Sequence, residues 1–272
     1  MTDDLGDRMK ALEEFETERR FLPTLPVYAR IDGRGFSRFT KDMNRPFDNR
    51  MTDAMIDTAK TIVEQTHATI GYVQSDELSF VWIPNANGDI WFDRKIAKMT
   101  SVLAGMATAA FIKSMMQRFD NAQQLLEKLP HFDARVICMP NQTEAANMLL
   151  WRNLDSTKNA VSMAAHHYFG HSSLQGMKSS EMQERLFQEA GVNFNDYPFA
   201  FKRGTWIKRD TIQRTFTEEE LERIPAQHRP ERDTVIARTN ISSFDLPPLN
   251  KIANRTQVLF YGETPQLLGN TL

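Results

Sequence analysis

The sequence predicts an α+β fold because strand-like and helix-like segments alternate through the first half of the chain. Apolar runs bounded by turn residues predict a strand at 27–31, a hairpin at 69–83 and a further strand at 132–139. Helical periodicity predicts helices between them, at 48–66 and 90–119. This order is the ferredoxin-like β-α-β-β-α-β arrangement, an antiparallel sheet with helices on one face, and we expect a strand from later in the chain to complete it.

Turn and capping residues mark the ends of these elements. Pro23 and Pro26 interrupt the chain before the first strand, and Asp48 is placed to cap the first helix. The second helix is rich in Met and Ala, which predicts burial against the sheet, where methionines fill gaps in the core.

A charged helix is expected before the sheet, at residues 5–20. Its apolar residues recur at helical spacing, at Leu5, Met9, Leu12 and Phe15. We expect the helix to pack on the domain through this stripe.

Helices are also expected after the sheet. One spans 143–170 with Thr143 as its N-cap, and another runs over 179–190, where the following glycine ends it. Residues 216–233 are rich in Glu, Arg and Pro and predict an acidic helix and a linker. A strand is expected at 234–238.

The composition is that of an ordinary globular protein, with 272 residues of which 41% are hydrophobic and 25% are charged. No stretch approaches the roughly 20 apolar residues of a membrane span, and the acidic N-terminus does not have the pattern of a signal or transit peptide. The single cysteine, Cys138, lies in an apolar run and is expected to be buried and reduced. These features predict a cytoplasmic protein that does not bind a membrane.

The formal net charge of −2 argues against a strongly basic domain that holds nucleic acid over its whole surface. RNA would have to be bound by local patches, and scattered Lys and Arg can equally be solvated surface. Two basic pairs bracket the apolar run 204–207, where a strand edge could meet a phosphate backbone. The candidate patch comprises Arg152, Lys158, Lys178, Arg185, Lys202, Arg203, Lys208, Arg209 and Arg214.

Acidic residues follow the predicted strands. Asp32 stands at the end of the first apolar run, and Asp76 and Glu77 stand in the turn of the central hairpin. Each motif alone is compatible with a turn that exposes a solvated charge. Two strands that deliver carboxylates to one sheet edge are typical of sites that hold two divalent ions about 4 Å apart for nucleotidyl transfer. Polymerase palms and nucleotidyl cyclases both place their acids in this way, so the fold alone does not decide the function.

The residues after Asp32 suit phosphate chemistry. Gly33 and Gly35 flank Arg34, and glycines let backbone groups approach a triphosphate or a metal closely. Further positive charge, enough to meet a polyanion, follows at Arg38, Lys41 and Arg45.

Three histidines lie close together in the sequence, at His166, His167 and His171. His167 and His171 have the i, i+4 spacing that places two imidazoles on one helical face. Gly170 lies between them and no acidic residue is near, so surface histidines or RNA phosphate contacts are favoured over a zinc site.

Seven segments keep a common order and rough spacing: Arg30-Ile-Asp-Gly-Arg-Gly-Phe-Ser-Arg-Phe39, Arg45-Pro-Phe-Asp-Asn-Arg50, Gly71-Tyr-Val-Gln-Ser-Asp-Glu-Leu-Ser-Phe-Val81, Phe132-Asp-Ala-Arg-Val136, Pro140-Asn-Gln142, Trp151-Arg152 and Lys202-Arg-Gly-Thr205. In these segments the chain resembles the tRNA-histidine guanylyltransferases and the related guanylyltransferase-like proteins, which polymerise in the 3′-to-5′ direction. One stretch departs from the family. The tRNA-histidine enzymes carry His-Ile-Asn-Asn-Leu-Tyr-Asn shortly after the Trp-Arg pair, and here only Asn159 matches it. The guanylyltransferase-like proteins also lack this stretch, which implies a role in repairing tRNA 5′ ends by templated addition.

The resemblance implies a reaction in two steps. ATP activates a 5′-monophosphorylated tRNA, and the 3′-hydroxyl of GTP or another templated nucleotide then attacks the activated phosphate. Two Mg²⁺ ions would be held by Asp32, Asp76 and the Gly33 carbonyl, with Glu77 as a further catalytic acid or an orienting residue. The family also implies a homotetramer.

The resemblance also implies contact residues. The expected nucleotide contacts are Asp32, Gly33, Arg34, Gly35, Phe36, Ser37, Arg45, Ser75 and Asp76, although Phe36 is interpreted as a residue of the core or strand end rather than a platform for a base. The expected RNA contacts are Arg152, Asn159, Lys202, Arg203, Lys208 and Arg209. Asp133 and Arg50 are interpreted as structural.

The chain is therefore divided into four parts: an N-terminal helix at 1–24, a palm-like catalytic domain at 25–140, a helical and basic region at 141–215, and a C-terminal extension of unassigned role at 216–272. Two other functions stay compatible with the sequence. One is a nucleotidyl cyclase, and the other is a non-catalytic RNA-binding palm protein, although the loss of Asp32 or Asp76 that would mark the latter has not occurred.

Overall fold

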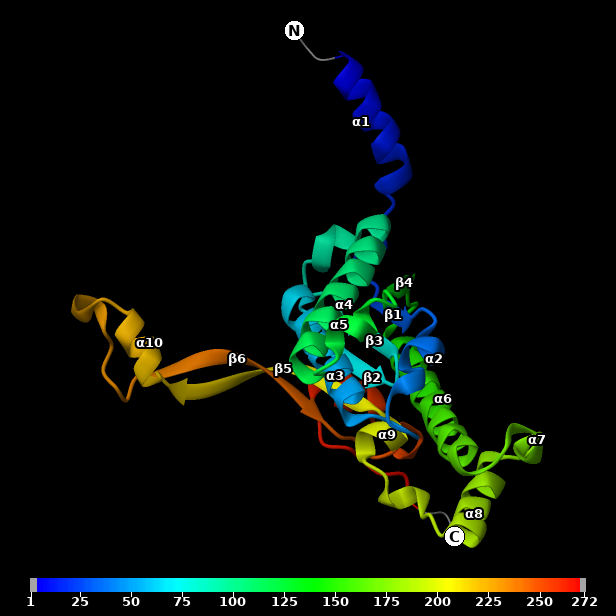
Figure 1. Ribbon diagram of the computed structural model, residues 1–272. Coiled ribbons are helices and arrows are strands. Elements are labelled where there is room, and N and C mark those ends of the chain that lie inside the picture. Colours follow the sequence, from blue (N-terminus) through cyan, green and yellow to red (C-terminus); the bar gives the residue numbers. More distant parts are fainter. Residues whose placement is uncertain (1–3, 270–272) are drawn as a thin grey trace.

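The fold is built on one antiparallel sheet (Figure 1), seen in a computed structural model that describes residues 4–269. Within these residues the sheet has six strands in the order β4-β1-β3-β2-β5-β6. The strands are β1 (Val27–Gly33), β2 (Ile70–Gln74), β3 (Glu77–Trp82), β4 (Phe132–Cys138), β5 (Thr205–Thr215) and β6 (Val235–Phe244). The first four strands have the predicted ferredoxin-like arrangement, and two later strands, rather than one, extend the sheet beyond β2.

The helices form a layer on each face of the sheet. Those described are α1 (Asp4–Thr17), α2 (Phe36–Phe39), α3 (Asn49–Thr66), α4 (Ile96–Arg118), α5 (Ala122–Leu126), α6 (Gln142–Tyr168), α7 (His171–Leu174), α8 (Ser179–Ala190), α9 (Phe199–Arg203), α10 (Glu218–Arg223) and α11 (Arg255–Tyr261). Helices α3 and α4 cover one face, as predicted for the ferredoxin-like core, and α6 and α11 cover the other.

The first layer is held by apolar side chains at regular spacing. Helix α4 presents Met99, Leu103, Ala107, Phe111 and Met115, every fourth residue, and all are fully buried. By length and composition alone α4 could cross a membrane, contrary to the sequence prediction. Here this stripe packs against the sheet and α3, as a core helix of a globular domain does.

The second layer packs on the opposite side chains of the same strands. Tyr28, Tyr72 and Trp206 alternate with the residues of the first layer and meet Leu149 of α6 and Leu259 of α11. Because both faces are covered, β2 and β3 are buried along their whole length.

Most capping predictions are confirmed. The side chain of Asp48 accepts from the Arg50 N–H at 3.0 Å and begins α3, and Gly191 ends α8 in the left-handed conformation. The predicted cap of α6 is wrong, because Asn141 caps it by accepting from the Glu144 N–H at 2.8 Å and Thr143 lies inside the helix. Cys138, expected to be buried, is half-buried on the edge strand β4.

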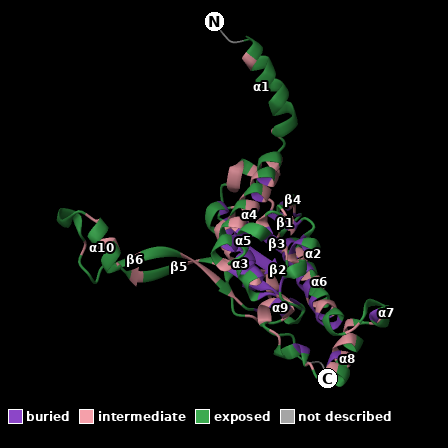
Figure 2. Cartoon of the chain, in the orientation of Figure 1, coloured by how far each residue is buried: buried purple, intermediate pink, exposed green. Residues whose placement is uncertain are grey.

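Helix α1 does not pack on the domain, contrary to expectation. None of its residues is buried, and Leu12 and Phe15 are 65% and 86% exposed. The chain is anchored just after the helix, where Glu18 and Arg20 pair with Lys95 and Asp93. Since α3, α4 and α6 already cover the sheet, the helix projects from the body (Figures 1 and 2).

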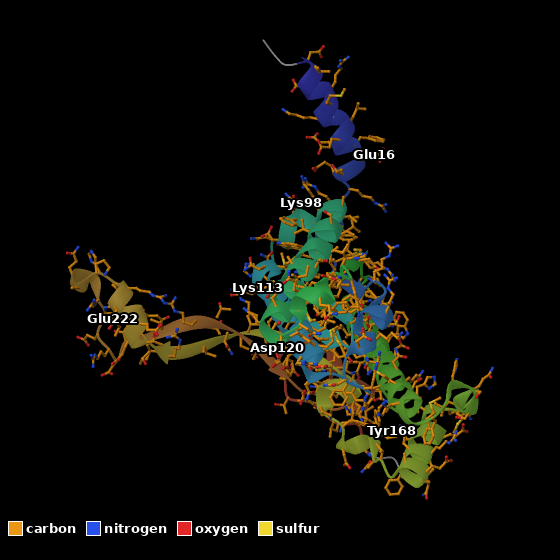
Figure 3. All side chains as sticks on the ribbon, in the orientation of Figure 1. Glu16, Lys98, Lys113, Asp120, Tyr168 and Glu222 are labelled. Carbon is orange, nitrogen blue, oxygen red and sulfur yellow. The ribbon has the colours of Figure 1, made fainter. Side chains whose placement is uncertain are left out.

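The acidic helix predicted within 216–233 is confirmed as α10, and the predicted linker is instead the closed end of a long hairpin. Strands β5 and β6 stay paired from Trp206↔Phe244 to Thr215↔Val235, so the predicted strand at 234–238 is confirmed and is longer. Only residues 205–208 of β5 pair with β2, so the rest leaves the body as an arm. Figure 3 shows Glu222 near the end of this arm.

Candidate active site

The register of the strands gathers the acidic residues at one edge of the sheet. Asp32 at the end of β1 lies opposite Glu77 of β3 on one side and Asp133 of β4 on the other. The Gly33 N–H donates to the Asp76 carbonyl at 3.0 Å, which ties the end of β1 to the β2–β3 turn. The two segments that carried the strongest sequence signal therefore meet in space.

The β2–β3 turn holds Asp76 through an unusual backbone conformation. Ser75 has a φ of 52°, in the left-handed region that costs a residue with a side chain about 1 kcal/mol or more. Such conformations persist where the surrounding structure enforces them, and they are frequent at functional sites. The turn therefore fixes Asp76 beside Asp32.

Asp76 carries charge that the protein does not neutralise. Burial raises the pKa of Asp76, its own backbone N–H lowers it, and the nearby Asp32 carboxylate raises it further. Among the described residues, no Lys, Arg or His forms an ion pair with Asp76. A buried carboxylate that lacks a cation of its own and faces a second carboxylate is a group that a divalent ion would stabilise.

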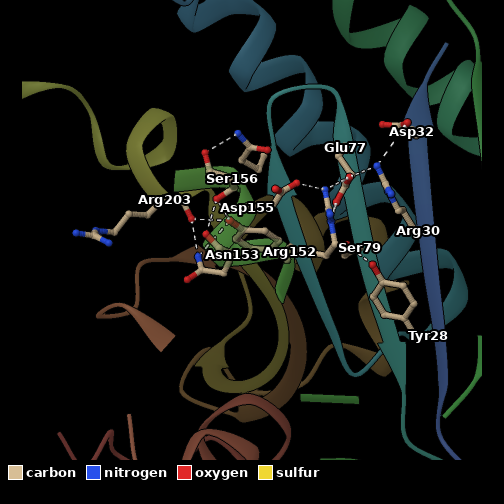
Figure 4. Close-up of polar contacts among 12 residues, drawn as sticks. Tyr28, Arg30, Asp32, Glu77, Ser79, Arg152, Asn153, Asp155, Ser156 and Arg203 are labelled. Carbon is tan, nitrogen blue, oxygen red and sulfur yellow. Dashed lines mark hydrogen bonds and ion pairs between the residues drawn. The ribbon is translucent and has the colours of Figure 1, made fainter. Parts of the chain in front are cut away.

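Glu77, in contrast, is neutralised twice (Figure 4). Arg152 donates to its two carboxylate oxygens at 2.6 and 2.7 Å, and Arg30 pairs with it at 2.7 Å. Arg30 also lies 3.6 Å from Asp32 and so connects the two acids. These contacts favour an orienting role for Glu77 over a role as a metal ligand. Sequence reasoning missed Arg30, although strand alternation places it on the same face as Asp32.

The residues fit a magnesium site in chemistry but not as a closed protein cage. Within residues 4–269, no group of three or more His, Cys, Asp or Glu side chains is arranged to hold a metal ion. Asp32, Asp76 and the Gly33 carbonyl supply hard oxygen donors, and Mg²⁺ commonly takes one or two carboxylates plus substrate phosphates. Such a site is completed by its substrate.

Gly33 must be a glycine because an aromatic ring occupies the space of a side chain. A Cβ at this position would lie 2.4 Å from Cδ2 of Phe36. The Phe36 ring is buried and packs against Phe39, Phe111 and Phe132. The interpretation of Phe36 as a core residue is therefore correct, although its edge also reaches the pocket described next.

A pocket of about 270 Å³ opens on the β2 side of the acidic pair. Five predicted nucleotide contacts line it: Phe36, Ser37, Arg45, Ser75 and Asp76. Asp32, Gly33, Arg34 and Gly35 are not among its lining residues. Sequence reasoning missed several others, among them Asn44, Phe47, Gln74, Met163, Phe201 and Thr205. The stacked rings of Phe47 and Phe201, 4.7 Å apart, come from segments that no local pattern connects.

The predicted RNA contacts do not form one surface. Arg152 is buried in its ion pair with Glu77, so the surface position expected for it is wrong. Asn159 is exposed on α6. Lys202 and Arg203 follow the pocket residue Phe201, whereas Lys208 lies opposite Ile70, at the other end of β2. Arg209 lies beyond it and contacts His67.

His167 and His171 do not share a helical face, as the glycine between them indicated. Helix α6 ends at Tyr168 and His171 begins α7, so helical spacing does not relate them. The rings that approach are those of His166 and His171, with centroids 5.2 Å apart.

Similar sequences give the site a context. Residues 7–140 match the sequence profile of the tRNAHis guanylyltransferase family. The tRNA(His) guanylyltransferase of Schizosaccharomyces pombe is 30% identical over 225 residues, which cover 76% of this chain and 82% of the relative. A probable tRNA(His) guanylyltransferase of Mus musculus is 30% identical over 245 residues, which cover 85% of this chain and 80% of the relative.

Solved structures show the same architecture. A bacterial tRNA(His) guanylyltransferase-like protein in complex with ATP superposes with a TM-score of 0.69 at 35% identity, over 75% of this chain and 88% of the other. A bacterial tRNA(His) guanylyltransferase-like protein in complex with GTP has a TM-score of 0.67 at 28% identity. This match covers 92% of this chain and 95% of the other.

Proposed function

Since the chain belongs to the tRNAHis guanylyltransferase family, whose members are nucleotidyltransferases, we propose that it adds guanylate or templated nucleotides to the 5′ end of tRNA in the 3′-to-5′ direction. The observation that carries this proposal is the carboxylate of Asp76, which lines the pocket, lies near the Asp32 carboxylate and has no ion-pair partner among the described residues. ATP activates the 5′-monophosphate, and the 3′-hydroxyl of the incoming nucleotide attacks it. Pyrophosphate and then AMP leave in the two steps.

The pocket next to Asp76 is the proposed nucleotide site. Similar proteins have been solved with ATP and with GTP, which supports a triphosphate as its occupant. Arg45 lines the pocket and, within residues 4–269, donates only to the Thr40 carbonyl, at 3.1 Å, so its guanidinium has donors left for phosphate oxygens.

Asp32, Asp76 and the Gly33 carbonyl would hold two Mg²⁺ ions, which would supply positive charge at the attacking and leaving oxygens. The protein positions both carboxylates. The turn at Ser75 positions Asp76, and Arg30 positions Asp32 by pairing with both Asp32 and Glu77. This arrangement pre-forms the oxygen donors before the substrates arrive.

A direct assay tests the proposal. The purified protein is incubated with Mg²⁺, ATP and labelled nucleotides, together with either a histidine tRNA that lacks its extra 5′ guanylate or another tRNA that lacks its first nucleotide. We expect nucleotide addition to the truncated tRNA that depends on the opposing template base. Addition to the histidine tRNA alone would restrict the substrate to that tRNA. Label in neither tRNA, or a cyclic product formed from nucleotide alone, would contradict the proposal.

A further inference from the structure

Helix α6 leaves a large aromatic side chain in solvent next to Arg152, the buried arginine that pairs with Glu77. Trp151 is 55% exposed, although tryptophans are usually well buried. Its ring is covered on one side by the guanidinium of Arg152, whose Cζ lies 4.7 Å from the ring centroid. An exposed aromatic ring backed by a fixed cation is a surface on which a nucleobase can stack.

The ring is connected to Asp32 by consecutive contacts. Arg152 binds Glu77, Glu77 binds Arg30, and Arg30 lies 3.6 Å from Asp32. Figure 4 shows this row of side chains across β3 and β1. Because Arg152 and Glu77 are buried, the guanidinium that backs the Trp151 ring is held at a fixed place relative to Asp32.

Helix geometry indicates the side of the sheet on which Trp151 lies. Asn153 points toward β2 and β5, where it donates to Tyr72 and to the Arg203 carbonyl. Residues of an α-helix are separated by about 100°, so Trp151 lies on the opposite flank of Arg152, toward β1 and β4. On that side β4 is the edge strand of the sheet. Its residue Arg135, the cross-strand neighbour of Arg30, is exposed.

The proposed reaction brings two substrates to the acids, and the pocket can take only one of them. The pocket lies on the β2 side of Asp76 and suits the nucleotide. The RNA end must then reach Asp32 from the open β1 and β4 side, which is where Trp151 lies.

We propose that Trp151 is a substrate-binding residue on which the 5′-terminal base of the tRNA stacks. The inference rests on the proposed function and adds to it a binding site for the RNA end. Stacking on an aromatic side chain is indifferent to base identity, which suits an enzyme that receives tRNAs with different first nucleotides.

The test uses a tRNA that already carries a 5′-triphosphate, so that the activation step is not needed. Trp151→Leu removes the aromatic ring but keeps an apolar side chain, and Trp151→Phe keeps a ring. We expect W151L to raise KM for the tRNA about tenfold or more, with KM for GTP changed less than about twofold, and W151F to stay near the wild type. Phe187→Leu is the matched control, because Phe187 on α8 is also 55% exposed.

A second readout reports stacking directly. The tRNA carries 2-aminopurine as its 5′-terminal base, and complex formation is followed separately by gel shift. Its fluorescence should be quenched in complexes with the wild type, W151F and F187L, and restored in the W151L complex.

Three outcomes would overturn the inference. Equal quenching and equal KM for tRNA in W151L would show that the base stacks elsewhere while the proposed function stands. A changed molecular mass of W151L in light scattering, with unchanged tRNA parameters, would show that this surface joins two copies of the chain. A wild-type protein that forms no complex with any tRNA would remove the proposed function and this site together.

Discussion

Arg152 of helix α6 donates from Nε and Nη2 to the two carboxylate oxygens of Glu77 at the start of β3. The side chains of this pair are 7% and 9% exposed, so the pair is nearly desolvated. It joins the second helical layer to the edge of the sheet where Asp32 and Asp76 meet.

Removal of Arg152 should therefore destabilise the protein. Arg152→Met leaves Glu77 buried with Arg30 as its remaining cation, and we expect the free energy of unfolding to fall by about 3 kcal/mol in urea denaturation. The double variant with Glu77→Gln should recover part of this loss, because the buried charge is gone. Lys128→Ala, which breaks the exposed pair with Asp42, is the control and should cost less than about 1 kcal/mol. Equal losses in the free energy of unfolding for R152M and K128A would contradict a stabilising role of the buried Arg152–Glu77 pair.

Asp32 and Asp76 should be essential for nucleotide addition, whereas Asp133 should not. Asp32→Asn or Asp76→Asn is expected to lower the rate of addition by about a thousandfold or more, since each removes a proposed donor to Mg²⁺. Asp133→Asn alters the carboxylate directly opposite Asp32 in β4 and should keep activity within about tenfold. Circular dichroism should show all three variants folded. A wild-type rate of nucleotide addition in D32N would contradict the role of Asp32 as a donor to Mg²⁺. A loss of rate in D133N as large as in D32N would add Asp133 to the proposed donors.

Gly33 should not tolerate even alanine. The added Cβ would meet the buried Phe36 ring, and we expect Gly33→Ala to destabilise the protein by about 1–3 kcal/mol. At Gly105 of α4, a Cβ would meet no atom within 4 Å beyond the backbone of its own helix, so Gly105→Ala should instead stabilise by about 0.5–1 kcal/mol. Thermal unfolding of the two variants in opposite directions checks the prediction, and a neutral G33A would show that the Phe36 ring can move.

Two buried tyrosines should make the fold sensitive to alkali. Burial raises the pKa of Tyr28 and of Tyr72 to about 12, from an ordinary value of 10.0. Between these values the unfolded chain loses the phenolic protons and the native protein keeps them, so stability falls as pH rises from about 10 to about 12. The loss is on the order of 2 to 3 kcal/mol for each ring. Urea denaturation at several pH values measures this slope, and Tyr28→Phe should make it shallower. An unchanged slope in Y28F would contradict the burial of the phenol.

Helix α1 should contribute little to the stability of the domain. None of its residues is buried, so deletion of residues 1–17 should change Tm by less than about 2 °C at high dilution. The deletion keeps Glu18, which pairs with Lys95. A larger fall in Tm, or a lower molecular mass in light scattering, would show that α1 binds another copy of the chain.

The sequence by itself determined the four-strand core and the meeting of its acids. Local signals were strong there: the apolar runs around Asp32 and Asp76 are short and bounded by turns, and Asp48 caps α3 as its side-chain chemistry predicts. Antiparallel pairing then brings a strand end and a hairpin turn together without further information.

Only the tertiary structure decided what each side chain faces. Phe47 and Phe201, or Glu77 and Arg152, are far apart in the chain, and no periodicity predicts that they touch. The apolar stripe of α1 predicted a buried helix, but α3, α4 and α6 already occupy both faces of the sheet. The basic residues Arg152 and Lys208 looked alike in the sequence, and burial separated a neutralised core arginine from a partly exposed lysine. Periodicity fixes which residues share a face of one element, whereas competition among all elements for the same surface fixes what that face contacts.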